Sequence, residues 1–125
     1  MLVYHFTVDL ELYDPVKNNP RALEEYIEKA SKIIDLIFDN LNNNRIKITC
    51  FVTNEFVENF SEIFHKKIVP YHEIGCHTRE HCFYKGNNRE EFIESIKENK
   101  EFIEKEIGRK CYGFRAPGCL PPRDI

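Results

Sequence analysis

The sequence predicts an α/β fold in which four strands alternate with three helices, in the order β-α-β-α-β-α-β. Two features predict it. Short runs rich in β-branched and aromatic residues alternate with longer segments whose apolar residues recur every three or four positions. Such alternation implies strands that pair in parallel through right-handed crossovers. With 125 residues, the chain has the length of one domain with one core.

The first predicted strand covers residues 2–8, a run of β-forming residues that reads as buried and ends at two acidic residues, Asp9 and Glu11. A loop rich in Asp, Asn and Pro follows. We expect the first helix to begin at Pro20, with Asn19 as its cap. Its apolar residues predict one buried face: Leu23, Ile27, Ala30, Ile34, Ile37 and Leu41.

The second strand is predicted over residues 46–53 and the second helix over residues 54–67, before a break at Pro70. The inward face of this helix is predicted to contain Phe56, Phe60, Ile63 and Phe64.

A short third strand is predicted over residues 72–76, and the third helix over residues 89–107, with Gly108 as its C-cap. Residues 110–115 complete the series as a fourth strand. The inward register of the third helix is predicted to be Phe92, Ile96, Asn99, Ile103 and Ile107.

The composition argues against several classes of partner. The formal net charge is −3, which gives no reason to expect a nucleic acid or a membrane surface. No apolar run approaches the ~18 residues of a membrane span, and the N-terminus lacks the features of a secretory leader. The five cysteines are therefore predicted to be reduced thiols in a cytoplasmic protein.

Reactive side chains follow three of the four predicted strands: Asp9 and Glu11 the first, His77 and His81 the third, and Arg115 the fourth. Because the carboxyl ends of parallel strands meet at one edge, these side chains are expected to lie together. Two histidines and a carboxylate are a ligand set for a catalytic divalent metal, with zinc as the default. The other carboxylate could then act as general base, with Arg115 orienting it or holding a substrate oxygen.

Four sequence blocks in this order resemble the NodB-like polysaccharide deacetylases, carbohydrate esterase family 4. They are the Asp9/Glu11 pair, Cys-Phe-Val-Thr at residues 50–53, His-Glu-Ile-Gly-Cys-His-Thr-Arg-Glu-His at residues 72–81, and Phe-Arg-Ala-Pro at residues 114–117. The resemblance runs from about residue 3 to residue 122 and implies a partial (β/α) barrel.

The resemblance also implies a function. It points to a metal-dependent hydrolase of non-peptide C–N (amide) bonds, which deacetylates an N-acetylated sugar or polysaccharide. Metal-bound water would attack the carbonyl, with Asp9 as base. The implied ligands of the divalent metal are Glu11, His77 and His81, and Asp9 is the alternative ligand to Glu11.

Three further roles are implied by the same resemblance. Arg115 would pair with the catalytic base, Thr78 would brace the histidine loop, and Pro117 would shape the groove wall. The metal is open among zinc, cobalt, nickel and iron. The substrate is open between a carbohydrate and a small non-sugar amide.

Members of that family continue past the arginine block with an Asp/Trp block and a Leu-His block, whose histidine is the general acid. Neither block occurs in this sequence, so residues 1–125 are expected to be the N-terminal half of such a domain. A missing second half, or a homo-oligomer, is expected to cover the open sheet edge. The remaining histidines are predicted to be structural or exposed: His5, His65 and His72.

Two other hypotheses remain open. The chain could be a metal-binding remnant or subunit without turnover of its own. It could also be a structural or partner-binding domain without metal, in which case His77→Ala would change only local packing.

Overall fold

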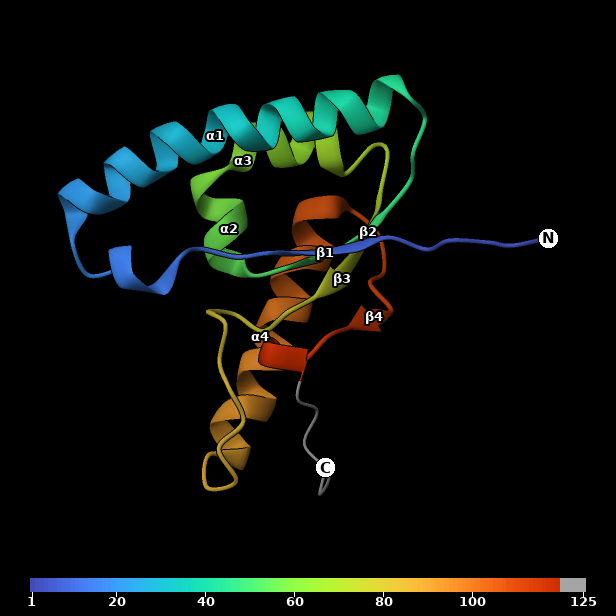
Figure 1. Ribbon diagram of the computed structural model, residues 1–125. Coiled ribbons are helices and arrows are strands. Elements are labelled where there is room, and N and C mark those ends of the chain that lie inside the picture. The colour runs from blue at the N-terminus through green and yellow to red at the C-terminus, as the bar shows by residue number, and fades with distance from the viewer. Residues whose placement is uncertain (120–125) are drawn as a thin grey trace.

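A four-stranded parallel sheet forms the centre of the fold (Figure 1), in a computed structural model that describes residues 1–119. The strands follow one another in the order β1 (Thr7–Leu10), β2 (Thr49–Val52), β3 (Glu73–Cys76) and β4 (Gly113–Phe114). Every neighbouring pair is parallel. This arrangement confirms the predicted α/β fold with alternating strands and helices.

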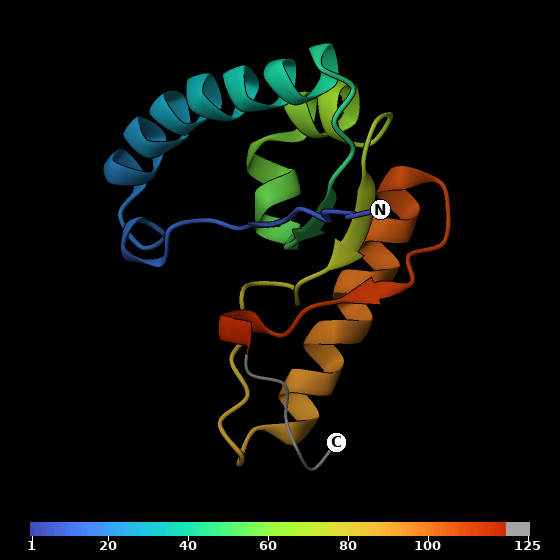
Figure 2. The same ribbon diagram turned by 45° about the vertical axis from the view of Figure 1, so that its right-hand side comes forward.

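Helices connect successive strands along the chain and pack against the sheet (Figure 2). The two long ones are close to prediction: α4 has the predicted bounds, and α1 begins at the predicted proline with Asn19 accepting the amide of Ala22 at 3.1 Å. Gly108 ends α4 in the left-handed conformation, with φ 68°. The helical elements are η1 (Asp14–Val16), α1 (Pro20–Asn43), α2 (Asn54–Asn59), α3 (Ser61–Ile63), the π-helical turn η2 (Phe64–Ile68), α4 (Arg89–Ile107) and η3 (Pro117–Cys119). None of the helices in the described part of the chain is long and apolar enough to span a membrane.

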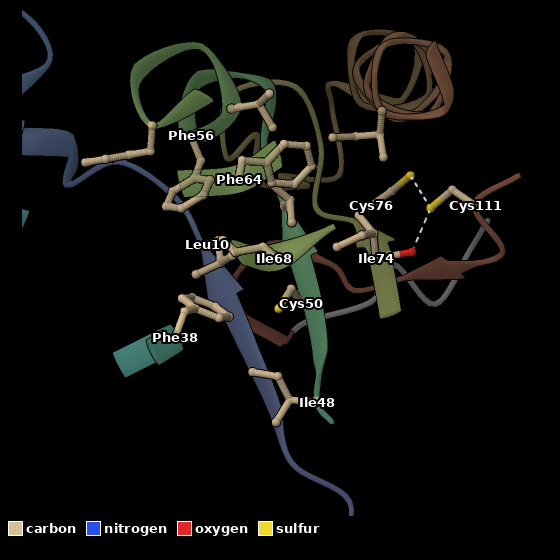
Figure 3. Packing of buried hydrophobic residues seen from close by; sticks show 14 of the residues in the cluster. Leu10, Phe38, Ile48, Cys50, Phe56, Phe64, Ile68, Ile74, Cys76 and Cys111 are labelled. Atoms are coloured by element: carbon tan, nitrogen blue, oxygen red, sulfur yellow. Dashed lines mark hydrogen bonds between the residues drawn. The ribbon is translucent and has the colours of Figure 1, made fainter. Parts of the chain in front are cut away.

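Successive strand residues point to opposite faces of the sheet, so the core residues lie on one face and the candidate site residues on the other. The face covered by helices carries the buried cluster drawn in Figure 3. The opposite face carries one residue from each strand in a single row, since Asp9 pairs with Phe51, Phe51 with Gly75, and Gly75 with Gly113. The core contributions of the strands are Leu10, Cys50, Val52, Ile74 and Cys76.

The first strand is shifted relative to the prediction. Residues 2–8 were expected to form it, but β1 covers Thr7–Leu10, and Leu2, Val3 and Phe6 are exposed. The reason is that, among the described strands, β1 pairs with β2 alone, and the first paired residue of β2 is Thr49. A strand needs a partner along its length, and residues 1–5 extend beyond the start of β2. The prediction of a buried strand over residues 2–6 is therefore wrong.

The buried face of α1 contains Phe38 in place of the predicted Ile37. Phe38 is 2% exposed and Ile37 is 49% exposed. After Ile34, a step of four reaches Phe38 and a step of three reaches Ile37, so helical spacing alone allows both. The ring of Phe38 packs edge-on against His72 at 5.2 Å between centroids, which shows the side that faces the core.

The single helix predicted over residues 54–67 is interrupted at Phe60, whose φ of −125° and ψ of 34° are not helical. The segment forms α2, α3 and η2 in succession. Phe56, Phe60 and Phe64 are nevertheless all buried, as predicted for the inward face of this segment.

The fourth strand is shorter than predicted, two residues in place of residues 110–115. The backbone amide of Cys111 donates to Glu104 Oε1 at 2.9 Å instead of joining the sheet. Within the described residues β1 and β4 each pair on one side only, which leaves both edges of the sheet open.

Candidate metal centre

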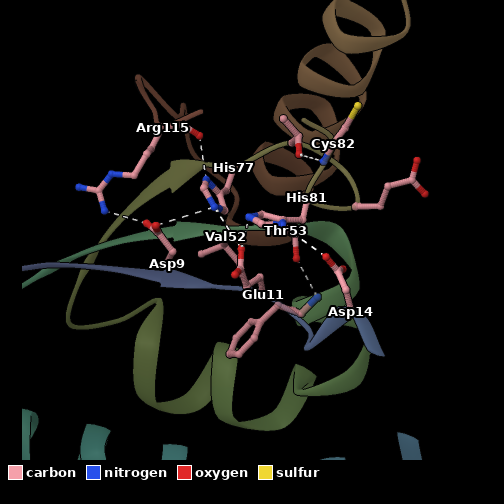
Figure 4. Close-up of polar contacts among 12 residues, drawn as sticks. Asp9, Glu11, Asp14, Val52, Thr53, His77, His81, Cys82 and Arg115 are labelled. Carbon is pink, nitrogen blue, oxygen red and sulfur yellow. Dashed lines mark hydrogen bonds and ion pairs between the residues drawn. The ribbon is translucent and has the colours of Figure 1, made fainter. Parts of the chain in front are cut away.

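Glu11, His77 and His81 meet at the carboxyl edge of the sheet (Figure 4). Each offers one ligand atom, and these atoms all lie within 4.8 Å of one another. Glu11 Oε2 is 2.6 Å from His81 Nε2 and 3.2 Å from His77 Nε2. Asp9, the alternative ligand, lies farther away, with Oδ2 3.9 Å from His77 Nε2. The geometry therefore favours Glu11 over Asp9 as the third ligand.

The environment of His77 leaves one ring nitrogen free for a cation. His77 Nδ1 lies 2.8 Å from the carbonyl oxygen of Arg115, so Nδ1 carries the proton and donates it. The lone pair on Nε2 then faces Glu11 Oε2, and both atoms are buried without a hydrogen-bond partner. Two facing lone pairs repel each other unless a proton or a metal ion lies between them, and two imidazoles with a carboxylate are a donor set that suits a divalent metal.

The charges around His77 favour its protonated form when no metal is bound. Burial lowers the pKa of His77. The Glu11 carboxylate, the Arg115 carbonyl and the charge of Asp9 together outweigh this effect, so the pKa of His77 lies above its ordinary value.

The loop from His77 to His81 is held in a strained conformation. Thr78 and His81 have positive φ angles of 67° and 58°, a region that side chains with a Cβ rarely adopt. The Thr78 hydroxyl accepts the amide of Cys82 at 2.8 Å, which joins the two ends of the loop. Such strain persists only where surrounding contacts impose it, and it often marks functional sites.

Helix α4 anchors the same loop from behind. Asn99 is fully buried, and its Oδ1 accepts the amide of His77 at 2.9 Å. Its Nδ2 donates to the carbonyl of Val52 at 3.0 Å and to Asn54 Oδ1 at 2.8 Å. One turn earlier, Ser95 Oγ accepts the amide of Arg79 at 3.0 Å. The sequence pattern placed Asn99 on the inward face of α4 but did not reveal this role.

A second carboxylate, which the sequence pattern left in a loop, faces His81. Asp14 Oδ2 lies 3.8 Å from His81 Nδ1, on the ring nitrogen opposite the one that faces Glu11. Asp14 also pairs with Lys17 at 2.7 Å. At this distance the contact is electrostatic and not a hydrogen bond, so Asp14 places a negative charge behind the His81 ring.

Arg115 connects the fourth strand to the first across the open face of the sheet. Its Nη1 donates to Asp9 Oδ1 at 2.7 Å, and its Nη2 donates to Thr7 Oγ1 at 2.6 Å. One carboxylate oxygen of Asp9 is thus occupied, while the other, Oδ2, faces His77 Nε2. Pro117 is buried at the start of η3, two residues farther along the chain.

The guanidinium of Arg115 rests on the ring of Phe51, with Cζ 4.3 Å from the ring centroid. The ring lies across Gly75, where an added Cβ would come within 2.6 Å of two ring carbons. At Gly113 an added Cβ would make ordinary contact at 3.5 Å. Gly75 therefore provides the space that lets Phe51 support Arg115.

The fold and site thus define a parallel α/β domain with two histidines and a carboxylate at its carboxyl edge, beside a carboxylate held by arginine. The family model for polysaccharide deacetylase matches residues 16–125, and the chain belongs to this family. No curated protein matches the chain.

Three solved structures illustrate the shared fold. The peptidoglycan deacetylase PdaC from Bacillus subtilis matches with a TM-score of 0.68 and 20% identity, over 96% of this chain and 51% of that one. A family 4 acetyl xylan esterase from Clostridium thermocellum, in complex with a cobalt ion, matches with a TM-score of 0.65 and 20% identity, over 93% of this chain and 49% of the esterase chain. BA3943, a CE4 family pseudoenzyme from Bacillus anthracis, matches with a TM-score of 0.63 and 18% identity, over 75% of this chain and 34% of the BA3943 chain. The chain thus spans about a third to a half of the length of these solved chains. The predicted single domain covers residues 1–125, and its last six residues lie outside the described part of the chain.

Proposed function

We propose that this chain carries the metal centre and the general base of a hydrolase acting on non-peptide C–N (amide) bonds. The proposed reaction is removal of the acetyl group from an N-acetylated sugar or polysaccharide. The observation that carries the proposal is the convergence of Glu11, His77 and His81 beside Asp9. Membership of the polysaccharide deacetylase family supports the reaction class.

The proposed cofactor is a divalent metal, with zinc first because a site with two imidazoles and one carboxylate suits it. When bound, the ion would supply Lewis acidity, which lowers the pKa of water and polarises the amide carbonyl. The cobalt ion in the acetyl xylan esterase makes cobalt the second candidate.

The remaining residues of the site would place and move a proton. Arg115 holds Asp9 Oδ1, so Oδ2 is the free oxygen that accepts the proton of the attacking water. Phe51 and Thr7 keep Arg115 in position, through the ring contact and the hydroxyl. The substrate is a carbohydrate or a small amide, and the cytoplasmic location remains a prediction.

A second candidate function is a metal-binding module without turnover of its own. A leaving amine needs a proton donor, and the other described histidines are engaged elsewhere. His5 contacts Thr49, His65 pairs with Glu106, and His72 bonds Asn42 and Ile48. The structural similarity to a pseudoenzyme of this family supports keeping this alternative.

Acetate release from N-acetylated glucosamine oligomers, measured on the zinc-loaded chain, separates the two functions. The proposal predicts release by the native chain, loss in Asp9→Asn, and retained zinc in both. Zinc binding without any release, in the native chain as in Asp9→Asn, would favour the module. Absence of both zinc and release would contradict both functions.

A further inference from the structure

Two buried thiols lie in contact on the helix side of the sheet. Cys76 is the last residue of β3, and Cys111 lies in the segment between α4 and β4. Their Sγ atoms are 3.4 Å apart and share a hydrogen bond, drawn in Figure 3. Cys111 Sγ also lies 3.3 Å from the carbonyl oxygen of Ile74. Both cysteines are 3% exposed, and neither belongs to the proposed metal centre.

We propose that Cys76 and Cys111 form a modification site, a dithiol that a peroxide converts into an intramolecular disulfide linking β3 to the α4–β4 segment. The sulfur atoms, now 3.4 Å apart, must approach to about 2.05 Å to form the bond. This movement is small because the two segments already pack against each other.

The edge of the sheet provides access for the oxidant. β4 contains two residues and pairs only with β3 among the described strands. Tyr112, next to Cys111, is 91% exposed, and Lys110 on the other side is exposed. Local opening of this edge uncovers Cys111 without unfolding the rest of the sheet.

Cys111 is the better nucleophile of the pair. The hydrogen bond from Cys76 lowers its pKa, burial opposes this, and the charge of Lys100 lowers it further. The Cys111 thiolate attacks one peroxide oxygen, so an S–O bond forms, the O–O bond breaks, and hydroxide leaves.

The thiol of Cys76 then attacks the sulfenic sulfur of Cys111. The S–S bond forms, the S–O bond breaks, and the released oxygen takes the thiol proton and leaves as water. In total two thiols are oxidised to one disulfide, and one peroxide is reduced to two waters.

The disulfide would restrain β4 and Arg115, which directly follows it. Cys76 pairs with Phe114 of β4, and its carbonyl accepts the amide of Arg115 at 3.0 Å, so Cys76 already contacts both. A second, covalent link ahead of Gly113 would resist opening of β4. This effect depends on the sheet edge and not on a bound metal.

The test uses the full chain with Cys82→Ser and Cys119→Ser, because these two cysteines are the more exposed ones. The protein is treated with graded hydrogen peroxide, denatured in an alkylating reagent, and measured by intact mass and peptide mapping. We expect loss of two hydrogens, a cross-link between the Cys76 and Cys111 peptides, and reversal by dithiothreitol. The thermal midpoint should rise by several degrees on oxidation.

Two variants provide controls in the same background. Cys111→Ala should lose the cross-link and the thermal shift, and Cys50→Ala, which removes another buried thiol, should keep both. The cross-link in the parent protein is informative even if a variant fails to fold. A cross-link to Cys50, oxidation of Cys76 and Cys111 to separate sulfinic acids, or no reaction with peroxide would overturn the proposal.

Discussion

Asn99, in the middle of α4, accepts a hydrogen bond from the backbone N–H of His77 at 2.9 Å. Its side-chain Nδ2 donates to Val52 and Asn54, in and just after β2. One buried side chain thus ties together the helix, the end of β2 and the histidine loop. Its removal leaves buried donors and acceptors without partners, which is costly in a protein interior.

We therefore expect Asn99→Leu to lower the free energy of unfolding by about 2–4 kcal/mol. Because the His77 backbone would lose its anchor, zinc affinity should fall about tenfold or more. Chemical denaturation and competition with a chelator measure the two effects. Lys97→Leu, the same substitution at an exposed position of α4, should change neither, and an equal effect in both variants would count against this role of Asn99.

The space above Gly75 is predicted to be essential for the position of Phe51. Gly75→Ala brings a Cβ within 2.6 Å of the ring, so the ring or the strand must move, and a loss of about 1–3 kcal/mol is expected. Gly113→Ala meets the same ring at 3.5 Å and should stay within about 0.5 kcal/mol of the native chain. Thermal unfolding of the two variants checks this contrast, which equal stabilities would refute.

Acid sensitivity is predicted at Glu104, whose pKa is lowered to about 2 by the amide of Cys111 and by Lys100. A carboxylate with a lowered pKa in the folded state stabilises the fold fully above its unfolded pKa of about 4.5. This contribution is lost as the pH falls from there towards 2. Unfolding followed across this range should show a weaker pH dependence in Glu104→Gln, and an unchanged slope would contradict the assignment.

Zinc binding is predicted to weaken as the pH is lowered from about 8 to about 5.5, because protonated imidazole cannot bind a metal. The pKa of His77 lies above its ordinary value in the metal-free chain, so protons compete from a higher pH than at an unperturbed histidine. Replacing Glu11 by Gln removes one source of the raised His77 pKa and one proposed ligand. Titrations at several pH values should show this dependence, and a flat profile would argue against ligation by His77.

The fold was largely predictable because local patterns determine much of it. The bounds of α4 follow from its apolar spacing and from Gly108, and the start of α1 follows from Asn19 and Pro20. The bounds of β1 and β4 were not predictable in the same way, since a strand extends only as far as its partner. Local spacing likewise cannot distinguish Ile37 from Phe38.

The same distinction between local patterns and long-range contacts applies to the candidate site. The paired histidines and the acidic pair ending the first strand are visible as spacing in the sequence, and the parallel order brings them to one edge. The contacts of Asp14 and Asn99 with the histidine loop could not be predicted, because they join segments distant in the chain. The support of Arg115 by Phe51 depends on the register that places Phe51 beside Gly75.

The most direct test of the central claim is the amount of zinc bound per purified chain, measured by elemental analysis after dialysis. His77→Ala is compared with His65→Ala, a histidine that pairs with Glu106 away from the site. We expect close to one equivalent in the native chain and in His65→Ala, and almost none in His77→Ala. The same zinc content in all three proteins, or none in the native chain, would contradict a metal centre formed by Glu11, His77 and His81.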